Sequence, residues 1–163
     1  AVVNVSGSLI INSGSIQPLG KFYNYYGDGG ETTGSLTSAG YGYGDIVKYG
    51  ATTGMTPGEL YYMNSSGNWA AANATDNTKG ADELLGIALG PSSEVDGVLL
   101  QGMVKSAQTL STKGAAVYMH TTDGELSQTR PTATNNIVRL VGYVVGGDNV
   151  IYFRPSSTWL KHG

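Results

Sequence analysis

The chain has 163 residues, with 12 Asp and Glu against 9 Lys and Arg, 25 glycines and no cysteine. This length suffices for one domain with a hydrophobic core, and the lack of cysteine excludes disulfides, thiolate metal sites and cysteine nucleophiles. The basic residues are scattered singly, and no apolar run approaches the roughly 20 residues of a membrane span. We therefore expect no nucleic acid and no membrane as partner, and the first residues show no signal-peptide pattern.

Residues 1–43 differ in composition from the rest of the chain. Gly, Ser, Thr and Tyr dominate, and the charged residues are Lys21, Asp28 and Glu31. We expect an extended N-terminal arm with one or two strands (residues 2–11 and 21–26) and a glycine–aromatic hinge at residues 40–44. Weakly charged strands of this kind can add to the sheet edge of another chain.

The remaining residues, 44–163, are expected to form an all-β, barrel-like core domain with a short C-terminal tail. Short runs rich in Val, Ile, Leu and Tyr are bounded by Gly, Ser, Asn, Asp and Thr, which predicts strands. The expected strands cover residues 45–49, 59–63, 84–89, 98–104, 116–119, 137–145 and 150–153. Residues 70–83 are rich in alanine but interrupted by Asn, Thr and Gly80, which predicts a long loop with at most one helical turn.

An internal repeat is the most informative feature of the sequence. The string LYYMNSS (residues 60–66) resembles AVYMHTT (116–122), and LLGIALG (84–90) resembles LVGYVVG (140–146). Tyr62 and Tyr118 are 56 residues apart, as are Gly86 and Gly142. We expect two pseudo-repeats, about 44–97 and 97–155, that pack as paired β-sheets or close a small β-barrel. Glycine within a strand predicts a bulge or tight bend at Gly86 and Gly142.

The sequence predicts no catalytic residue, no cofactor and no metal. The chain has two histidines, His120 and His162, and neither a G-x-S-x-G nor an S-x-x-K motif. His120 corresponds to Asn64 in the repeat, which favours a polar turn residue over a general base. Asp28 and Glu31 flank a glycine turn but form only a weak calcium signal.

Carboxylates and tyrosines are the remaining candidates for chemistry. Three close carboxylate pairs fall in Gly/Ser/Thr-rich turns, where solvated carboxylates are ordinary: Asp82 with Glu83, Glu94 with Asp96, and Asp123 with Glu125. Tyrosines within expected strands could stack on sugars, but core or interface positions are favoured. These tyrosines are Tyr61, Tyr62, Tyr118, Tyr143 and Tyr152.

Five strings in a fixed order carry a family resemblance: GELYYMNSSGNW (58–69), LLGIALG (84–90), DGVLLQG (96–102), VRLVGY (138–143) and IYFRPS (151–156). This order resembles a β-domain found in structural proteins of tailed bacteriophages, including phages of cyanobacteria and marine bacteria. The resemblance covers about residues 44–160. It implies a virion component with a β-barrel-like domain and no enzymatic role, made in the host bacterial cytoplasm.

Because the domain stands almost alone behind a short arm, we favour a capsid decoration, or cement, protein on the capsid surface. Its expected partners are the major capsid protein and itself, as a homotrimer by analogy with other decoration proteins. The alternatives are a tail-fibre or tail-tip domain for host adhesion, whose exposed Tyr and Trp would bind glycans, and a small enzyme. The candidate contact residues are Val2, Val3, Val5, Leu9, Ile10, Ile11, Phe22, Tyr23, Tyr25, Tyr26, Trp159 and Leu160. Trp159 could instead pack on its own barrel.

Overall fold

The computed structural model describes residues 36–145 and 149–163, which form ten β-strands and no helix. The all-β class expected from the sequence is therefore confirmed. The strands are β1 (Gly42–Val47), β2 (Leu60–Met63), β3 (Trp69–Ala71), β4 (Leu85–Ala88), β5 (Val98–Lys105), β6 (Ala116–Met119), β7 (Leu126–Ser127), β8 (Ile137–Val144), β9 (Val150–Phe153) and β10 (Trp159–Lys161).

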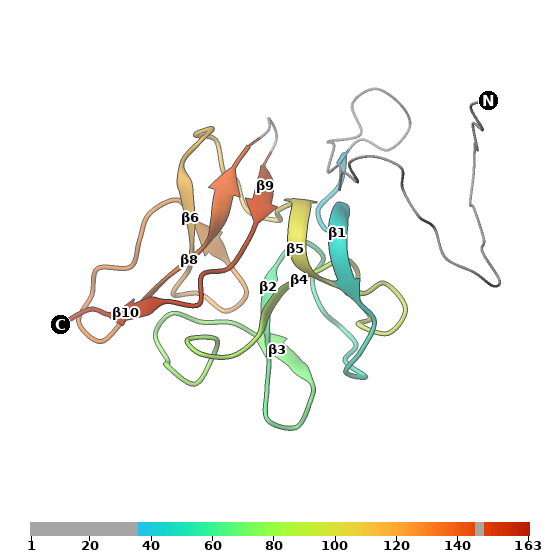
Figure 1. Ribbon diagram of the computed structural model, residues 1–163, viewed down its shortest axis with the longest axis horizontal. Coiled ribbons are helices and arrows are strands. Elements are labelled where there is room, and N and C mark those ends of the chain that lie inside the picture. Colours follow the sequence, from blue (N-terminus) through green and yellow to red (C-terminus); the bar gives the residue numbers. More distant parts are fainter. Residues whose placement is uncertain (1–35, 146–148) are drawn as a thin grey trace, which may run out of the picture.

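Strand β5 joins the two parts of one antiparallel sheet, ordered β3-β2-β4-β5-β9-β8-β6-β7. β1 pairs with β5 along nearly its whole length, from Val98 to Val104. β4 pairs with the beginning of β5 and β9 with its end. Because a strand has two edges, β4 and β9 must share the edge that β1 leaves open, and the sheet divides there. Figure 1 shows β6, β8 and β9 on one side of β5 and β2, β3 and β4 below it.

The internal repeat has a structural counterpart in the strand pairing. β2 lies between β3 and β4, and β6 lies in the same way between β7 and β8. The pair Tyr61–Gly86 in the first repeat corresponds to Val117–Gly142 in the second, with both members 56 residues later. The two repeats therefore have the same strand register at these glycines.

Gly142 lies beside a bulge, as the sequence predicts. The register between β6 and β8 shifts after Val117, because Tyr118 pairs with Leu140 and leaves Val141 without an opposite residue. Gly86 lies in regular register instead, and a Cβ there would approach Cγ1 of Val98 to 2.3 Å. At that position close packing across the sheet, and not a bulge, requires glycine.

A single hydrophobic core joins the two repeats. Leu60, Leu85 and Ile87 of the first repeat pack in one buried cluster with Val117 and Phe153 of the second. A smaller cluster covers the other face of the first repeat; it includes Met55, Tyr61, Trp69 and Ala88, together with Val98 at the start of β5. Tyr61 thus faces away from the shared core, whereas its counterpart Val117 faces into it.

Three short strands were not expected from the sequence, and one expected loop begins later than predicted. β3, β7 and β10 have two or three residues each, which is too short for an alternating pattern. The first residues of the expected loop 70–83 belong to β3, and the rest forms turns without a helix. The prediction of a hinge at residues 40–44 is also wrong in part, because residues 42–44 are the first residues of strand β1.

The expected N-terminal arm lies mostly outside the described residues. This holds for both of its predicted strands, for Asp28 and Glu31, and for all ten of its candidate contact residues. Leu36 is buried, and the backbone N–H of Gly40 donates a hydrogen bond to the carbonyl of Lys105 at 2.9 Å. The backbone of Gly40 and Tyr41 therefore bonds to Lys105 at the end of β5 before β1 begins.

Candidate functional site

His120 lies in the turn between β6 and β7, where the repeat predicts a polar turn residue. Its Nδ1 accepts a hydrogen bond from the backbone N–H of Thr122 at 3.2 Å and lies 3.1 Å from Oε2 of Glu125. Asn64, its counterpart in the first repeat, accepts the equivalent bond from the N–H of Ser66 at 3.0 Å. Turn geometry therefore accounts for the position of His120.

Glu59, directly before β2, approaches the same turn. Partial burial raises the pKa of its carboxyl group, and the nearby Glu125 raises it further, while a hydrogen bond from the Thr56 side chain opposes both. An acid with a raised pKa near a second carboxylate is a feature that acid–base sites share. However, none of Glu59, His120 and Glu125 lines either of the two surface grooves described below.

Replacing Glu59 with glutamine is expected to stabilise the protein near pH 7. A carboxyl group with a raised pKa in the folded state is ionised more readily in the unfolded chain, so its contribution to stability falls as the pH rises. Glutamine keeps a hydrogen-bond acceptor but cannot ionise.

Urea denaturation of both proteins at pH 7 and at a pH below 4.5, the ordinary pKa of the group, measures this difference. The stabilisation should be present at pH 7 and shrink toward zero in acid, where wild-type Glu59 is protonated. Glu94→Gln, at an exposed carboxylate, should change neither value. A variant less stable than wild type at pH 7 would show that ionised Glu59 is favourably placed.

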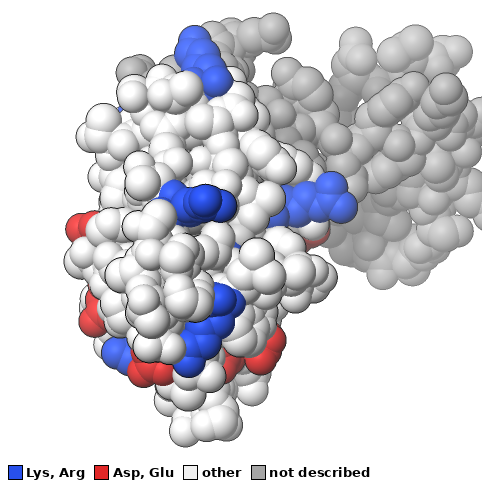
Figure 2. All heavy atoms as spheres, turned by 90° about the vertical axis from the view of Figure 1, so that its left-hand side faces the viewer, with Lys and Arg blue, Asp and Glu red and all other residues white. Residues whose placement is uncertain are grey.

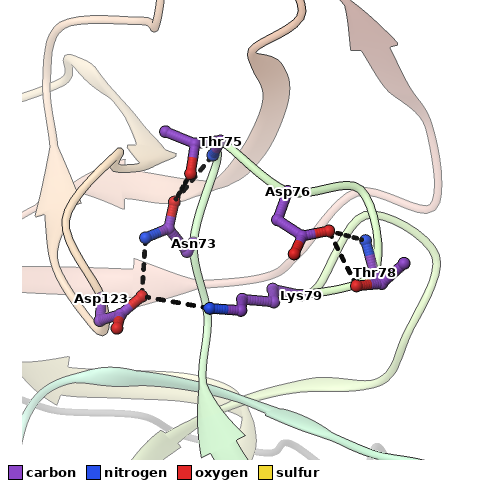
Figure 3. Close-up of polar contacts among 6 residues, drawn as sticks. All are labelled: Asn73, Thr75, Asp76, Thr78, Lys79 and Asp123. Carbon is purple, nitrogen blue, oxygen red and sulfur yellow. Dashed lines mark hydrogen bonds and ion pairs between the residues drawn. The ribbon is translucent and has the colours of Figure 1, made fainter.

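One carboxylate within the long loop holds a turn, and another, in the turn between β6 and β7, joins the two repeats (Figure 3). Asp123 Oδ1 accepts a hydrogen bond from Nδ2 of Asn73 at 2.6 Å and lies 4.0 Å from Nζ of Lys79. Asp76 Oδ1 accepts bonds from the backbone N–H and the hydroxyl of Thr78, which lower the pKa of Asp76. Within the described residues, no three His, Asp or Glu side chains group as metal ligands would.

Arg139 on β8 is a buried charged residue that sequence reasoning missed. Its side chain is buried, and its Nη1 donates hydrogen bonds to the carbonyls of Gly80 (2.7 Å), Ala81 (2.9 Å) and Glu83 (2.9 Å). Its Nε donates to the carbonyl of Ser156 at 2.9 Å. Burial lowers the pKa of Arg139, while the charges of Glu83 and Asp82 oppose that effect.

The other candidate contact residues, Trp159 and Leu160, lie on β10, which pairs with β8. Trp159 packs against the shared core, and its Nε1 donates a hydrogen bond to the carboxylate of Asp82. Leu160 is exposed. Of these two residues, Leu160 is thus the one that presents its side chain to the surface.

One surface groove follows the edge of the sheet at β1. We call it the β1 groove; it has a volume of about 330 Å³ and is lined by Gly40, Tyr41, Gly42, Tyr43, Ile46, Leu89 and Asp96. Tyr41 is 54% exposed and Ile46 44%. Among residues 36–145 and 149–163, no strand pairs with the second edge of β1. The β1 groove therefore exposes apolar side chains at this edge of the sheet.

A second groove lies on the outer face of the second repeat. We call it the tyrosine groove; it has a volume of about 460 Å³ and is lined by Leu140, Tyr143, Tyr152, Arg154, Pro155, Ser156 and Ser157. Among the five tyrosines named from the sequence, Tyr143 and Tyr152 meet here, whereas Tyr61 is buried in the first repeat. Tyr62 packs against the shared core and Tyr118 pairs with Leu140.

Charge is sparse over the surface that Figure 2 shows. Lys and Arg side chains on that face do not merge into one continuous basic area. In the part of the chain that the structure describes, no helix is long and apolar enough to cross a membrane. Neither a protein-family model nor a curated protein matches the chain.

Proposed function

We propose that this chain is a non-enzymatic structural protein of a bacteriophage virion, and specifically a decoration protein that stabilises the head by bridging capsomers. The proposal rests on the resemblance of residues 44–160 to phage structural domains and on one structural observation. That observation is the β1 groove, whose lining includes the exposed side chains of Tyr41 and Ile46.

A groove of this kind suits association with another polypeptide. Exposed apolar side chains that lie together on a surface are typical of interaction sites. A protein that binds across joints between capsomers, and not to free subunits, stabilises the assembled shell by mass action.

The polar side chains that are the strongest candidates for catalysis have structural roles instead, which supports a binding role. Arg139 holds backbone carbonyls, His120 closes a turn, and Asp123 joins the repeats. Each buried side-chain nitrogen or oxygen in the described residues has a hydrogen-bond partner.

The number of copies per virion tests the proposal. Quantitative mass spectrometry of purified virions should give a ratio near one copy per major capsid protein, and light scattering should give three times the monomer mass. A ratio far below one would indicate that the chain is a fibre or tip domain of the tail. Absence from virions would overturn the proposal.

Replacing Ile46 with aspartate should abolish binding to undecorated heads, because it places a charge in the β1 groove. Ile46 is already exposed, so the variant should keep its fold and melting temperature. Leu84→Asp, at an exposed leucine outside the groove, should bind heads as wild type does. Equal binding of both variants in a cosedimentation assay would show that the β1 groove is not part of the interface.

A further inference from the structure

Strand register places aromatic side chains in a row across the outer face of the second repeat. Met103 on β5 lies opposite both Tyr43 on β1 and Tyr152 on β9, and Tyr152 lies opposite Tyr143 on β8. Directly opposed residues of neighbouring strands project to the same face. The adjacent row, which contains Val104, Ile151 and Val144, is buried in the core, so the tyrosines face outward.

In the first repeat the chain itself covers the corresponding face. Trp69 donates hydrogen bonds from its Nε1 to the carbonyl of Tyr49 at 2.8 Å and from its backbone N–H to Oγ1 of Thr52 at 2.9 Å. Met55 completes this cover. On the second repeat, the tyrosine groove is open, and Tyr143 is 46% exposed.

The walls of the tyrosine groove are fixed by bonds to the sheet. The backbone N–H groups of Arg154 and Ser156 donate to the carbonyls of Val141 and Leu140, each at 2.9 Å. Buried Arg139 holds the carbonyl of Ser156, and Nε2 of Gln101 donates to the hydroxyl of Tyr152 at 3.2 Å. Sites that are already ordered lose less conformational entropy on binding.

The lining of the groove defines the ligand chemistry. Tyrosine offers a flat apolar ring, on which the C–H face of a sugar can stack, and a hydroxyl for its polar edge. Arg154 is exposed, with a guanidinium group whose forked N–H donors match carboxylate and sulfate oxygens. The groove lining contains one cation and no Asp or Glu.

We propose that the tyrosine groove binds an acidic oligosaccharide. One sugar ring stacks on Tyr143, and a carboxylate or sulfate of the same or the next residue pairs with Arg154. Single-stranded nucleic acid is the less suitable anion, because the groove supplies one basic side chain and the whole chain carries a net charge of −3. This inference does not depend on where in a virion the chain resides.

Titration of the full-length, ¹⁵N-labelled protein tests the proposal. The probes are a tetragalacturonate, a sulfated carrageenan tetrasaccharide, neutral maltotetraose and oligothymidylate. Amide shifts at residues 140–143 and 152–157 should appear with an acidic sugar, and maltotetraose should bind about tenfold more weakly. The two acidic probes distinguish a carboxylate from a sulfate preference.

Matched variants separate the groove from general surface effects. Tyr143→Ala and Arg154→Gln should each weaken binding about tenfold or more, the scale of losing one stacked or charge-assisted contact. Tyr49→Ala and Arg130→Gln, at exposed residues outside the groove, should bind as wild type does. The proposal is overturned if no acidic sugar shifts these amides at millimolar concentration, if the shifts map elsewhere, or if oligothymidylate binds more tightly than both sugars.

Discussion

Replacing Arg139 with alanine is expected to destabilise the protein far more than the removal of an exposed charge would. The guanidinium group serves four backbone carbonyls, those of Gly80, Ala81, Glu83 and Ser156. Alanine would leave carbonyls without a donor and open a cavity where a side chain with 6% exposure had been. Each buried acceptor that is left without a donor costs about 1–3 kcal/mol, so we expect a loss of about 3–5 kcal/mol. This corresponds to a fall in melting temperature of about 6–20 °C.

The position of the contacts predicts which segments loosen first. Arg139 ties residues 80–83 of the first repeat and Ser156 of the C-terminal segment to β8. Trp159 adds a bond from β10 to Asp82 in the same loop. Hydrogen exchange of Arg139→Ala should therefore rise at residues 76–84 and 155–161 before it rises in β5 or β6.

Two further variants make the result specific. Arg130→Ala removes an exposed arginine and should change the free energy of unfolding by less than about 0.5 kcal/mol. Arg139→Lys keeps the charge but loses the planar fork of donors, so its stability should fall between those of wild type and Arg139→Ala. If Arg139→Ala and Arg130→Ala had the same melting temperature, the contacts of Arg139 with the carbonyls would contribute nothing to the stability of the folded state.

A signal for Arg139 was present in the sequence, although its partners were not. Ile137 and Val141 are buried in the core, and residues 137, 139 and 141 share one face of a strand by the two-residue period. An arginine in that series has to be satisfied within the protein. Three of its four carbonyl partners lie in a loop more than 50 residues away, which no local pattern can indicate.

Strand prediction succeeded where apolar runs were long enough to alternate. β6 and β9 have the expected bounds, and β5 and β8 differ from expectation by a single residue each. β3 and β10 depend on pairing with β2 and β8, and each begins with a tryptophan that follows polar residues. Strands of this length exist because a neighbour supplies their hydrogen bonds, so the tertiary fold determines them.

Equivalent positions of the two repeats have equivalent strand partners, but their side chains do not lie on the same face of the sheet relative to the shared core. Tyr61 and Val117 occupy equivalent pairs, yet Tyr61 belongs to the outer cluster and Val117 to the shared core. The bulge opposite Val117 changes the alternation along β8, where Val141 and Val144 are buried and Tyr143 is exposed. As a result, sequence similarity between the repeats could not predict that Tyr143 would face outward in the groove.

The second large effect is expected for Gly102→Ala, which should separate β1 from β5. Gly102 lies opposite Gly44, and both have a left-handed backbone, with φ of 144° and 145°. A Cβ on Gly102 would lie 2.0 Å from the carbonyl oxygen of Tyr43 and 2.8 Å from Cα of Gly44. These are backbone atoms that no side-chain rotation can move away, so the strain of the backbone and the clash add. We expect a loss of more than about 3 kcal/mol.

Gly114→Ala is the matched control, because Gly114 also has a left-handed φ of 77° but no atom within 4 Å of the added Cβ. It should cost about 1–2 kcal/mol, which is the backbone term without the clash. Thermal melts of both variants compare the two, and amide spectra of Gly102→Ala should lose their native positions first at residues 42–47 and 98–105. Equal costs for both variants would mean that β1 can shift away from β5 freely. A larger cost for Gly102→Ala would mean that the β1 groove, with Tyr41 and Ile46 at its border, depends on two glycine backbones in contact.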